Sequence, residues 1–144
     1  MFLLDTNVVS ELRKAKAGRA DKNVVAWAAG AAASSMFVSA ITVQELEIGV
    51  LLAEQRDPAQ GAILRRWLEA QVLPAFAERI LPVDTAVARR SATLHVPDPR
   101  PVRDSLIAAT ALVHAMPVVT CNVADFAPSG VEIIDPWRPL DEGA

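Results

Sequence analysis

The sequence predicts an α/β fold, a three-layer α/β/α sandwich around a mainly parallel central sheet. Five short apolar segments are typical of strands buried on both faces. They cover residues 1–4, 36–39, 80–83, 117–120 and 131–134. Helical stretches separate the last four, and this alternation indicates right-handed crossovers and parallel pairing.

Helices are expected over 7–13, 22–33, 43–56, 58–72, 85–95 and 101–114. Asp21 and Asp84 are expected as N-caps, and Thr42 is expected to open the third helix. Pro58 and Pro101 stand at helix starts, where the missing proline N–H costs no hydrogen bond.

The length of 144 residues fits one domain with a substantial core, so we expect a single domain over 1–144. The tail after about residue 137 is expected to be flexible. No apolar run is as long as a membrane span, and residues 1–4 lack a basic leader. Cys121 is the single cysteine, fits a reducing compartment and is expected to be a small core residue. A cytoplasmic protein without membrane contact is therefore expected.

The formal net charge of −3 excludes nucleic-acid binding by overall charge, so such a function needs a local basic patch. Residues 13–22 form one candidate patch, for which a solvated loop is the alternative interpretation. Arg100 and Arg103, which flank Asp104, are competing candidates for a contact to a nucleic-acid backbone.

Acidic and amide side chains follow the predicted strands. Asp5 ends the first strand, and Glu45 lies in the first turn of the helix after the second. Asn122 and Asp125 follow the fourth strand, and Asp104 lies near the start of the helix that leads into it. Ligands of open parallel sheets bind outside the carboxyl ends of the strands, where strand order reverses. We therefore expect these side chains to meet on one rim.

Such a cluster needs shared protons or a divalent cation, because neighbouring carboxylates raise one another's pKa. Oxygen ligands without cysteine or histidine suit Mg²⁺ or Mn²⁺ rather than zinc. A bound ion of this kind activates water for attack at phosphorus without a protein nucleophile. This chemistry agrees with the lack of a convincing Ser-His-Asp or Cys-His set.

Each acid also has a structural interpretation. Asp5 can cap the helix that follows it, and residues 42–45 match a capping box that would make Glu45 structural. Asp104 can interact with a helix dipole, and Asp125 can begin a turn. Their joint placement on one rim is what favours a functional site.

Four segments, in this order, resemble the PIN-domain ribonucleases: LLDTNVVSEL at 3–12, SAITVQELEIGV at 39–50, PRPVRDSLIAATALVHAMPVVTCNVADF at 99–126 and SGVEIIDPW at 129–137. The resemblance covers essentially the whole chain and is closest to toxins of type II toxin–antitoxin pairs, of the VapC and FitB kind. It implies a Mg²⁺- or Mn²⁺-dependent endoribonuclease that hydrolyses RNA phosphodiester bonds. It also implies a homodimer and a small DNA-binding antitoxin whose tail fills the site.

The resemblance carries Asp5, Glu45 and Asp104 over as metal-binding or catalytic acids. It places Asn122 as a further metal ligand and Asp125 as a further catalytic acid, and whether Asn122 or Asp125 completes the site stays open. The positions implied to orient Asp5 or to contact substrate are Thr6, Asn7 and Thr120. Cys121 stands where family members often carry arginine, which removes one expected phosphate contact.

The alternative function is a non-enzymatic domain of the same fold that acts through protein binding. A degenerate PIN domain is one form, and the intact Asp5, Glu45 and Asp104 argue against it. A receiver-like regulatory module is another, but it requires a lysine late in the chain, whereas the last lysine is Lys22.

Overall fold

The computed structural model describes residues 1–140. Its central sheet has five strands in the order β3-β2-β1-β4-β5, and every pairing is parallel. The strands are β1 (Phe2–Leu4), β2 (Met36–Ser39), β3 (Ile80–Leu81), β4 (Val118–Val119) and β5 (Ile133–Ile134). The predicted three-layer α/β fold with a parallel sheet is confirmed, although most strands are shorter than predicted.

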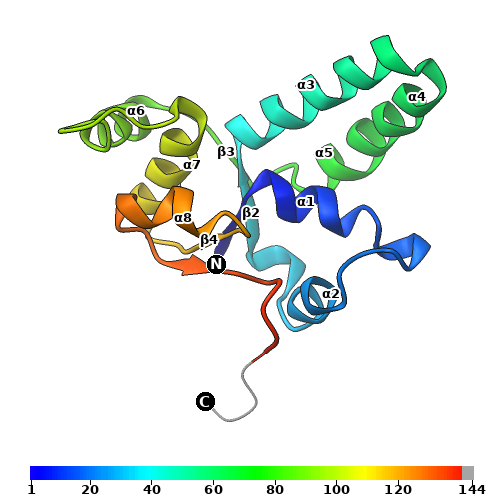
Figure 1. Cartoon of the computed structure of the whole chain (residues 1–144), viewed down its shortest axis with the longest axis horizontal. Helices are drawn as coiled ribbons and strands as arrows, with labels where there is room; N and C mark the ends of the chain where they lie inside the picture. Colours follow the sequence, from blue (N-terminus) through cyan, green and yellow to red (C-terminus); the bar gives the residue numbers. More distant parts are fainter. Residues whose placement is uncertain (141–144) are drawn as a thin grey trace.

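Two helical layers cover the sheet (Figure 1). One layer holds α1 (Thr6–Leu12), α2 (Lys22–Ala29), α3 (Ala40–Arg56), α4 (Pro58–Trp67) and α5 (Leu73–Ala75). The other holds α6 (Thr85–Thr93), α7 (Val102–Val113) and α8 (Val123–Phe126). No helix of residues 1–140 combines the length and apolar character needed to span a bilayer.

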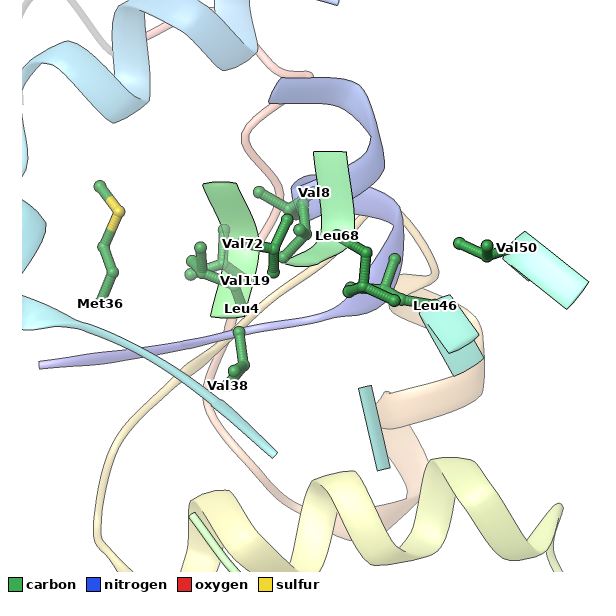
Figure 2. Close-up of a cluster of buried hydrophobic side chains, with 10 residues drawn as sticks. Leu4, Val8, Met36, Val38, Leu46, Val50, Leu68, Val72 and Val119 are labelled. Atoms are coloured by element: carbon green, nitrogen blue, oxygen red, sulfur yellow. The ribbon is translucent and has the colours of Figure 1, made fainter. Parts of the chain in front are cut away.

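The alternation of side chains along β1 explains how one strand holds both layers. Successive residues of a strand point to opposite faces of the sheet. Leu3 packs in a cluster with α7 and α8, whereas Leu4 packs in a cluster with α1 and α3, and both leucines are fully buried. Figure 2 shows the Leu4 cluster, which also contains Val119 of the neighbouring strand β4. Both faces are therefore apolar, as the short apolar segments predicted.

The helix starts agree with the sequence at two caps and differ at a third. Asp21 caps α2 by accepting from the Asn23 and Val24 amides, and Asp84 caps α6. The predicted role of Thr42 is wrong, because α3 begins at Ala40 with Ser39 as its N-cap.

Other differences concern element ends. Helix α4 begins at Pro58 as predicted and continues through a π-helical turn, Leu68–Val72, into α5. Helix α7 begins one residue after Pro101, and the short α8 was not predicted. The expected flexible tail lies partly outside the described residues, at 141–144. At the start of that tail, the Trp137 carbonyl accepts a hydrogen bond from Asn23 at 2.8 Å.

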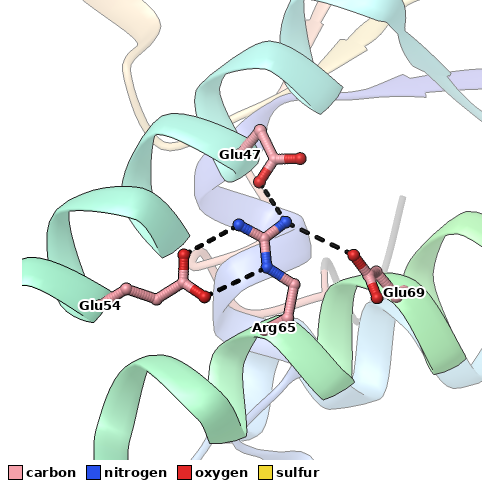
Figure 3. Close-up of polar contacts among 4 residues, drawn as sticks. All are labelled: Glu47, Glu54, Arg65 and Glu69. Carbon is pink, nitrogen blue, oxygen red and sulfur yellow. Dashed lines mark hydrogen bonds and ion pairs between the residues drawn. The ribbon is translucent and has the colours of Figure 1, made fainter. Parts of the chain in front are cut away.

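Helices α3 and α4 form a hairpin that extends away from the sheet (Figure 1). Arg65 of α4 ties the hairpin together by ion pairs to Glu47 and Glu54 of α3 and to Glu69 (Figure 3). The Arg65 hydrogen bond lowers the pKa of Glu54. Close approach of the two helices requires Gly61, because a Cβ there would lie 2.5 Å from the Glu54 Cα.

Gly61→Ala is expected to lower the free energy of unfolding by about 1–3 kcal/mol, since the added methyl overpacks the helix contact. Gly49→Ala is the matched control in α3, where a Cβ meets no atom within 4 Å. It should instead raise stability by about 0.5–1 kcal/mol through helix propensity. Urea unfolding of both variants measures the two signs, and equal changes would contradict the close approach at Gly61.

Candidate functional site

Asp5 lies where β1 ends against β4, with 4% of its surface exposed. Its backbone N–H donates to the Val119 carbonyl at 2.9 Å, which fixes it beside the end of β4. Its Oδ1 accepts from the Thr6 amide at 2.8 Å. Its Oδ2 accepts from the Thr120 hydroxyl at 2.8 Å and from Asn7 Nδ2 at 3.0 Å. Asp5 therefore caps α1 and also sits at the switch point of the sheet, where ligands of this architecture bind.

Burial raises the pKa of the Asp5 carboxyl above its ordinary value, because a low-dielectric environment disfavours the charged form. The hydrogen bonds from Thr120, Thr6 and Asn7 oppose this effect by stabilising the carboxylate, and the negative charge of Glu45 adds to it. Asp5 is thus held in one orientation by three donors but remains costly to ionise.

Glu45 lies in the second turn of α3 and not in the first turn as predicted, because the helix begins at Ala40. The expected capping box is absent for the same reason. Glu45 Oε1 accepts from the Thr6 hydroxyl at 2.7 Å. Its Oε2 lies 3.7 Å from Arg103 Nε. Glu45 is therefore connected to the Asp5 loop by Thr6 and to α7 by Arg103.

Asp104 enters the same region from the opposite helical layer. It lies in the first turn of α7, and Ala108 and Ala111 on its face are buried, as expected. Burial raises the pKa of the Asp104 carboxyl, and the charges of Asp5, Asp125 and Glu45 raise it further. Asp5, Glu45 and Asp125 are thus close enough to Asp104 to raise its pKa, although the four residues come from different elements.

The segment after β4 is organised by the Thr120 hydroxyl. Besides donating to Asp5, this oxygen accepts from the Asn122 amide at 2.9 Å and from Asn7 Nδ2 at 3.2 Å. Asn122 and Asp125 are exposed at the start of α8. Within residues 1–140, no three His, Cys, Asp or Glu side chains form a ready-made group for a metal ion. The acids are therefore electrostatically coupled without forming one coordination group.

The sequence analysis missed the contact of Thr42 with the site and placed Cys121 wrongly. Thr42 was expected to open a helix, but it is buried and its hydroxyl oxygen lies 3.3 Å from that of Thr6. A stripe of Thr42, Leu46 and Val50 at helical spacing was the available signal for its inward position. Cys121 was expected in the core, yet it is exposed beside Asn122. Burial and the charges of Asp135 and Asp5 raise the pKa of its thiol, so it is a weak nucleophile.

A groove runs between α1 and the helical segment that follows α4. Its volume is about 170 Å³, and its floor is mainly apolar, with Val9, Leu12 and Phe76 among the lining residues. Arg13 and Lys16 from the predicted basic segment line one edge. They also line an adjoining hollow of about 330 Å³ with Arg66. Part of the 13–22 segment therefore borders a groove, whereas Lys14 pairs with Glu11.

Comparison with known proteins gives concordant matches along the chain. Residues 2–127 match the family model described as PIN domain. The chain is 40% identical to VapC ribonuclease Y4jK of Sinorhizobium fredii and 37% identical to Toxin FitB of Neisseria gonorrhoeae. Each alignment covers 96% of this chain and 99% of the relative. The solved structure of FitAB bound to an IR36 DNA fragment has a TM-score of 0.87, at 34% identity over 99% of each chain.

The raised pKa of Asp104 predicts a pH-dependent gain from Asp104→Asn. A carboxyl whose folded pKa exceeds its unfolded value costs nothing at low pH, where both states are protonated, and destabilises the fold as pH rises. In EDTA, Asp104→Asn should therefore melt above the wild type at pH 7, and the two should converge below about pH 3.9. The exposed Asp98→Asn is the charge-matched control and should show no such gap. A gap that persists at low pH would contradict the electrostatic cause.

Proposed function

The chain belongs to the PIN domain family, and from this premise we propose that it is a metal-dependent endoribonuclease, the toxin of a type II toxin–antitoxin pair. The observation that carries the proposal is the grouping of Asp5, Glu45 and Asp104 at the switch point of the sheet. The charge of Asp125 also raises the pKa of Asp104. Carboxyls whose pKa is raised by burial and by neighbouring carboxylates, as for Asp5 and Asp104, are typical of functional sites. The ribonuclease and toxin names of the two relatives support the same activity.

The donor set fits a hard divalent cation. The candidate ligands are the carboxylates of Asp5, Glu45 and Asp104, with Asn122 offering an amide oxygen, and such oxygen ligands suit Mg²⁺ or Mn²⁺. A bound ion supplies a water of lowered pKa and neutralises charge on a phosphate. Its binding would also relieve the repulsion among the acids. The exposed Asn122 and Asp125 have room to turn toward the other ligands.

The chain's own residues contribute orientation. Thr6, Asn7 and Thr120 hold Asp5 in place, and Thr6 also holds Glu45. Hydrolysis would join a water oxygen to phosphorus and break the bond from phosphorus to one ribose oxygen, which takes up a proton. Asp125 is a candidate to accept the proton of the attacking water, because it is exposed beside Asp104 without a buried structural role.

Partner binding is proposed on two surfaces. The groove floored by Val9, Leu12 and Phe76 and edged by Arg13 and Lys16 suits an antitoxin segment with apolar and acidic side chains. A homodimer is supported by the exposed apolar side chains of the α3–α4 hairpin, because such patches mark interaction sites. These side chains are Ile48, Leu51, Leu52 and Ile63.

Removal of single acids tests the enzymatic proposal. Asp5→Asn, Glu45→Gln and Asp104→Asn should each lower kcat on a random-sequence RNA pool with Mn²⁺ by about 100-fold or more, the usual effect of deleting one preorganised electrostatic group. Thr120→Val should weaken Mn²⁺ binding about 10–100-fold, because it frees a ligand that Thr120 orients. Gel-resolved cleavage and calorimetry measure the two quantities.

Asp98→Asn again serves as the charge-matched control, with cleavage and Mn²⁺ binding like the wild type. A folded wild type that neither binds Mn²⁺ nor cleaves the pool would favour the alternative, a PIN domain kept for protein binding. Cleavage that survives Asp104→Asn and Asp5→Asn would place the active site elsewhere.

Charge reversal at the groove edge tests the antitoxin proposal. Lys16→Glu should raise the Kd for the cognate antitoxin several-fold, mainly through slower association at low salt, because rim charges steer encounter. Lys22→Glu, which removes a cation of the same segment outside the groove, is the control and should leave Kd unchanged. Biolayer interferometry gives both rate constants, and equal effects of the two variants would argue against the groove.

A further inference from the structure

Arg103 is a cation placed among the acids of the site. It occupies the second residue of α7, next to Asp104, and its side chain is 51% exposed. Its Nε lies 3.7 Å from Glu45 Oε2, while the other Glu45 oxygen accepts from Thr6. Arg103 therefore faces the site from the same helix that carries Asp104.

The charge environment makes this position distinctive. The positive charge of Arg103 lowers the pKa of Asp104, whereas the charges of Asp5, Asp125 and Glu45 raise it. A negatively charged phosphodiester that approaches this rim would be repelled by the carboxylates of Asp5, Glu45 and Asp104, whereas the Arg103 guanidinium would attract it. A site for RNA needs such a group, because phosphate contacts supply most of the affinity.

The ion pair with Glu45 engages only part of the Arg103 guanidinium. A separation of 3.7 Å is too long for a hydrogen bond, and half-exposed ion pairs contribute little stability. Arginine has five N–H donors in a planar fork that matches two oxygens of a phosphate. Within residues 1–140 most of these donors therefore have no partner, and the exposure of the side chain lets the fork turn outward.

We propose that Arg103 is a substrate-binding residue that contacts a non-bridging phosphate oxygen of the RNA at the cleavage site. This assignment rests on the proposed function, since it takes RNA as the substrate and Glu45 as a ligand of the divalent cation. Arg103 and that cation compete for Glu45, so Arg103 is expected to leave Glu45 for the phosphate when the site is complete.

Competition for Glu45 gives the first test. Calorimetry with Mn²⁺ alone should show that Arg103→Ala binds the ion at least as tightly as the wild type, because a competing cation has been removed. Arg89→Ala, an exposed arginine of α6, is the charge-matched control and should bind like the wild type. Weaker Mn²⁺ binding by Arg103→Ala alone would mean that Arg103 supports the acids structurally, and it would overturn the assignment.

Salt dependence of RNA binding gives the second test, on the Asp5→Asn background and with fluorescein-labelled random-sequence RNA. Adding Arg103→Ala should raise Kd about 10-fold or more, as expected for hydrogen bonds to a charged group. It should also reduce the slope of log K against log salt by about 0.7, the effect of one lost phosphate contact on a single strand. Arg103→Lys should keep the slope but bind less tightly, because lysine lacks the fork.

An unchanged slope and Kd in Arg103→Ala would overturn the assignment, whereas the reduced slope with unimpaired Mn²⁺ binding would support it. Failure of the proposed function has a different signature. In that case the wild type would not cleave RNA in Mn²⁺, whether or not the salt slope reports a phosphate contact at Arg103.

Discussion

The buried carboxylate of Asp5 is the constraint on which the site depends. An ionised group removed from water is costly unless it is hydrogen-bonded. Asp5 obtains its donors from the following turn, through Thr6 and Asn7, and from the end of β4, through Thr120. The parallel pairing of β1 with β4 is what brings the last of these within reach. The start of α1 and the end of β4 are therefore both fastened to one side chain.

The other acids reach Asp5 from the two helical layers. Thr42 on the buried face of α3 contacts Thr6, and Glu45, three residues further along the same helix, accepts a hydrogen bond from the Thr6 hydroxyl. On the other layer, the buried Ala108 lets α7 pack closely and brings Asp104 near. The site is thus a seam between layers, so its geometry depends on how both helices pack on the sheet. The raised pKa of Asp104 is the electrostatic consequence of that packing.

The positions of the positively charged side chains suit the proposed nuclease. With a net charge of −3, the chain cannot attract RNA by overall charge. Among its cations, Arg13 and Lys16 line the α1 groove, and Arg103 lies beside Glu45 at the acidic rim. Arg65 contributes to neither region, because its ion pairs with the glutamates of α3 hold the α3–α4 hairpin together.

The sequence by itself determined the layered parallel fold, the approximate strand positions, the caps Asp21 and Asp84, and the placement of acids after strands. These features depend on apolar pattern and on residues within a turn of one another. Only the tertiary structure decided that Thr42 reaches Thr6 and that Arg103 faces Glu45. It also decided the short strands, because strand ends depend on where neighbours stop pairing. The contacts of Thr6 with Thr42 and of Thr120 with Asp5 join residues 36 and 115 positions apart, and no local preference can specify a partner at such a separation before the layers pack.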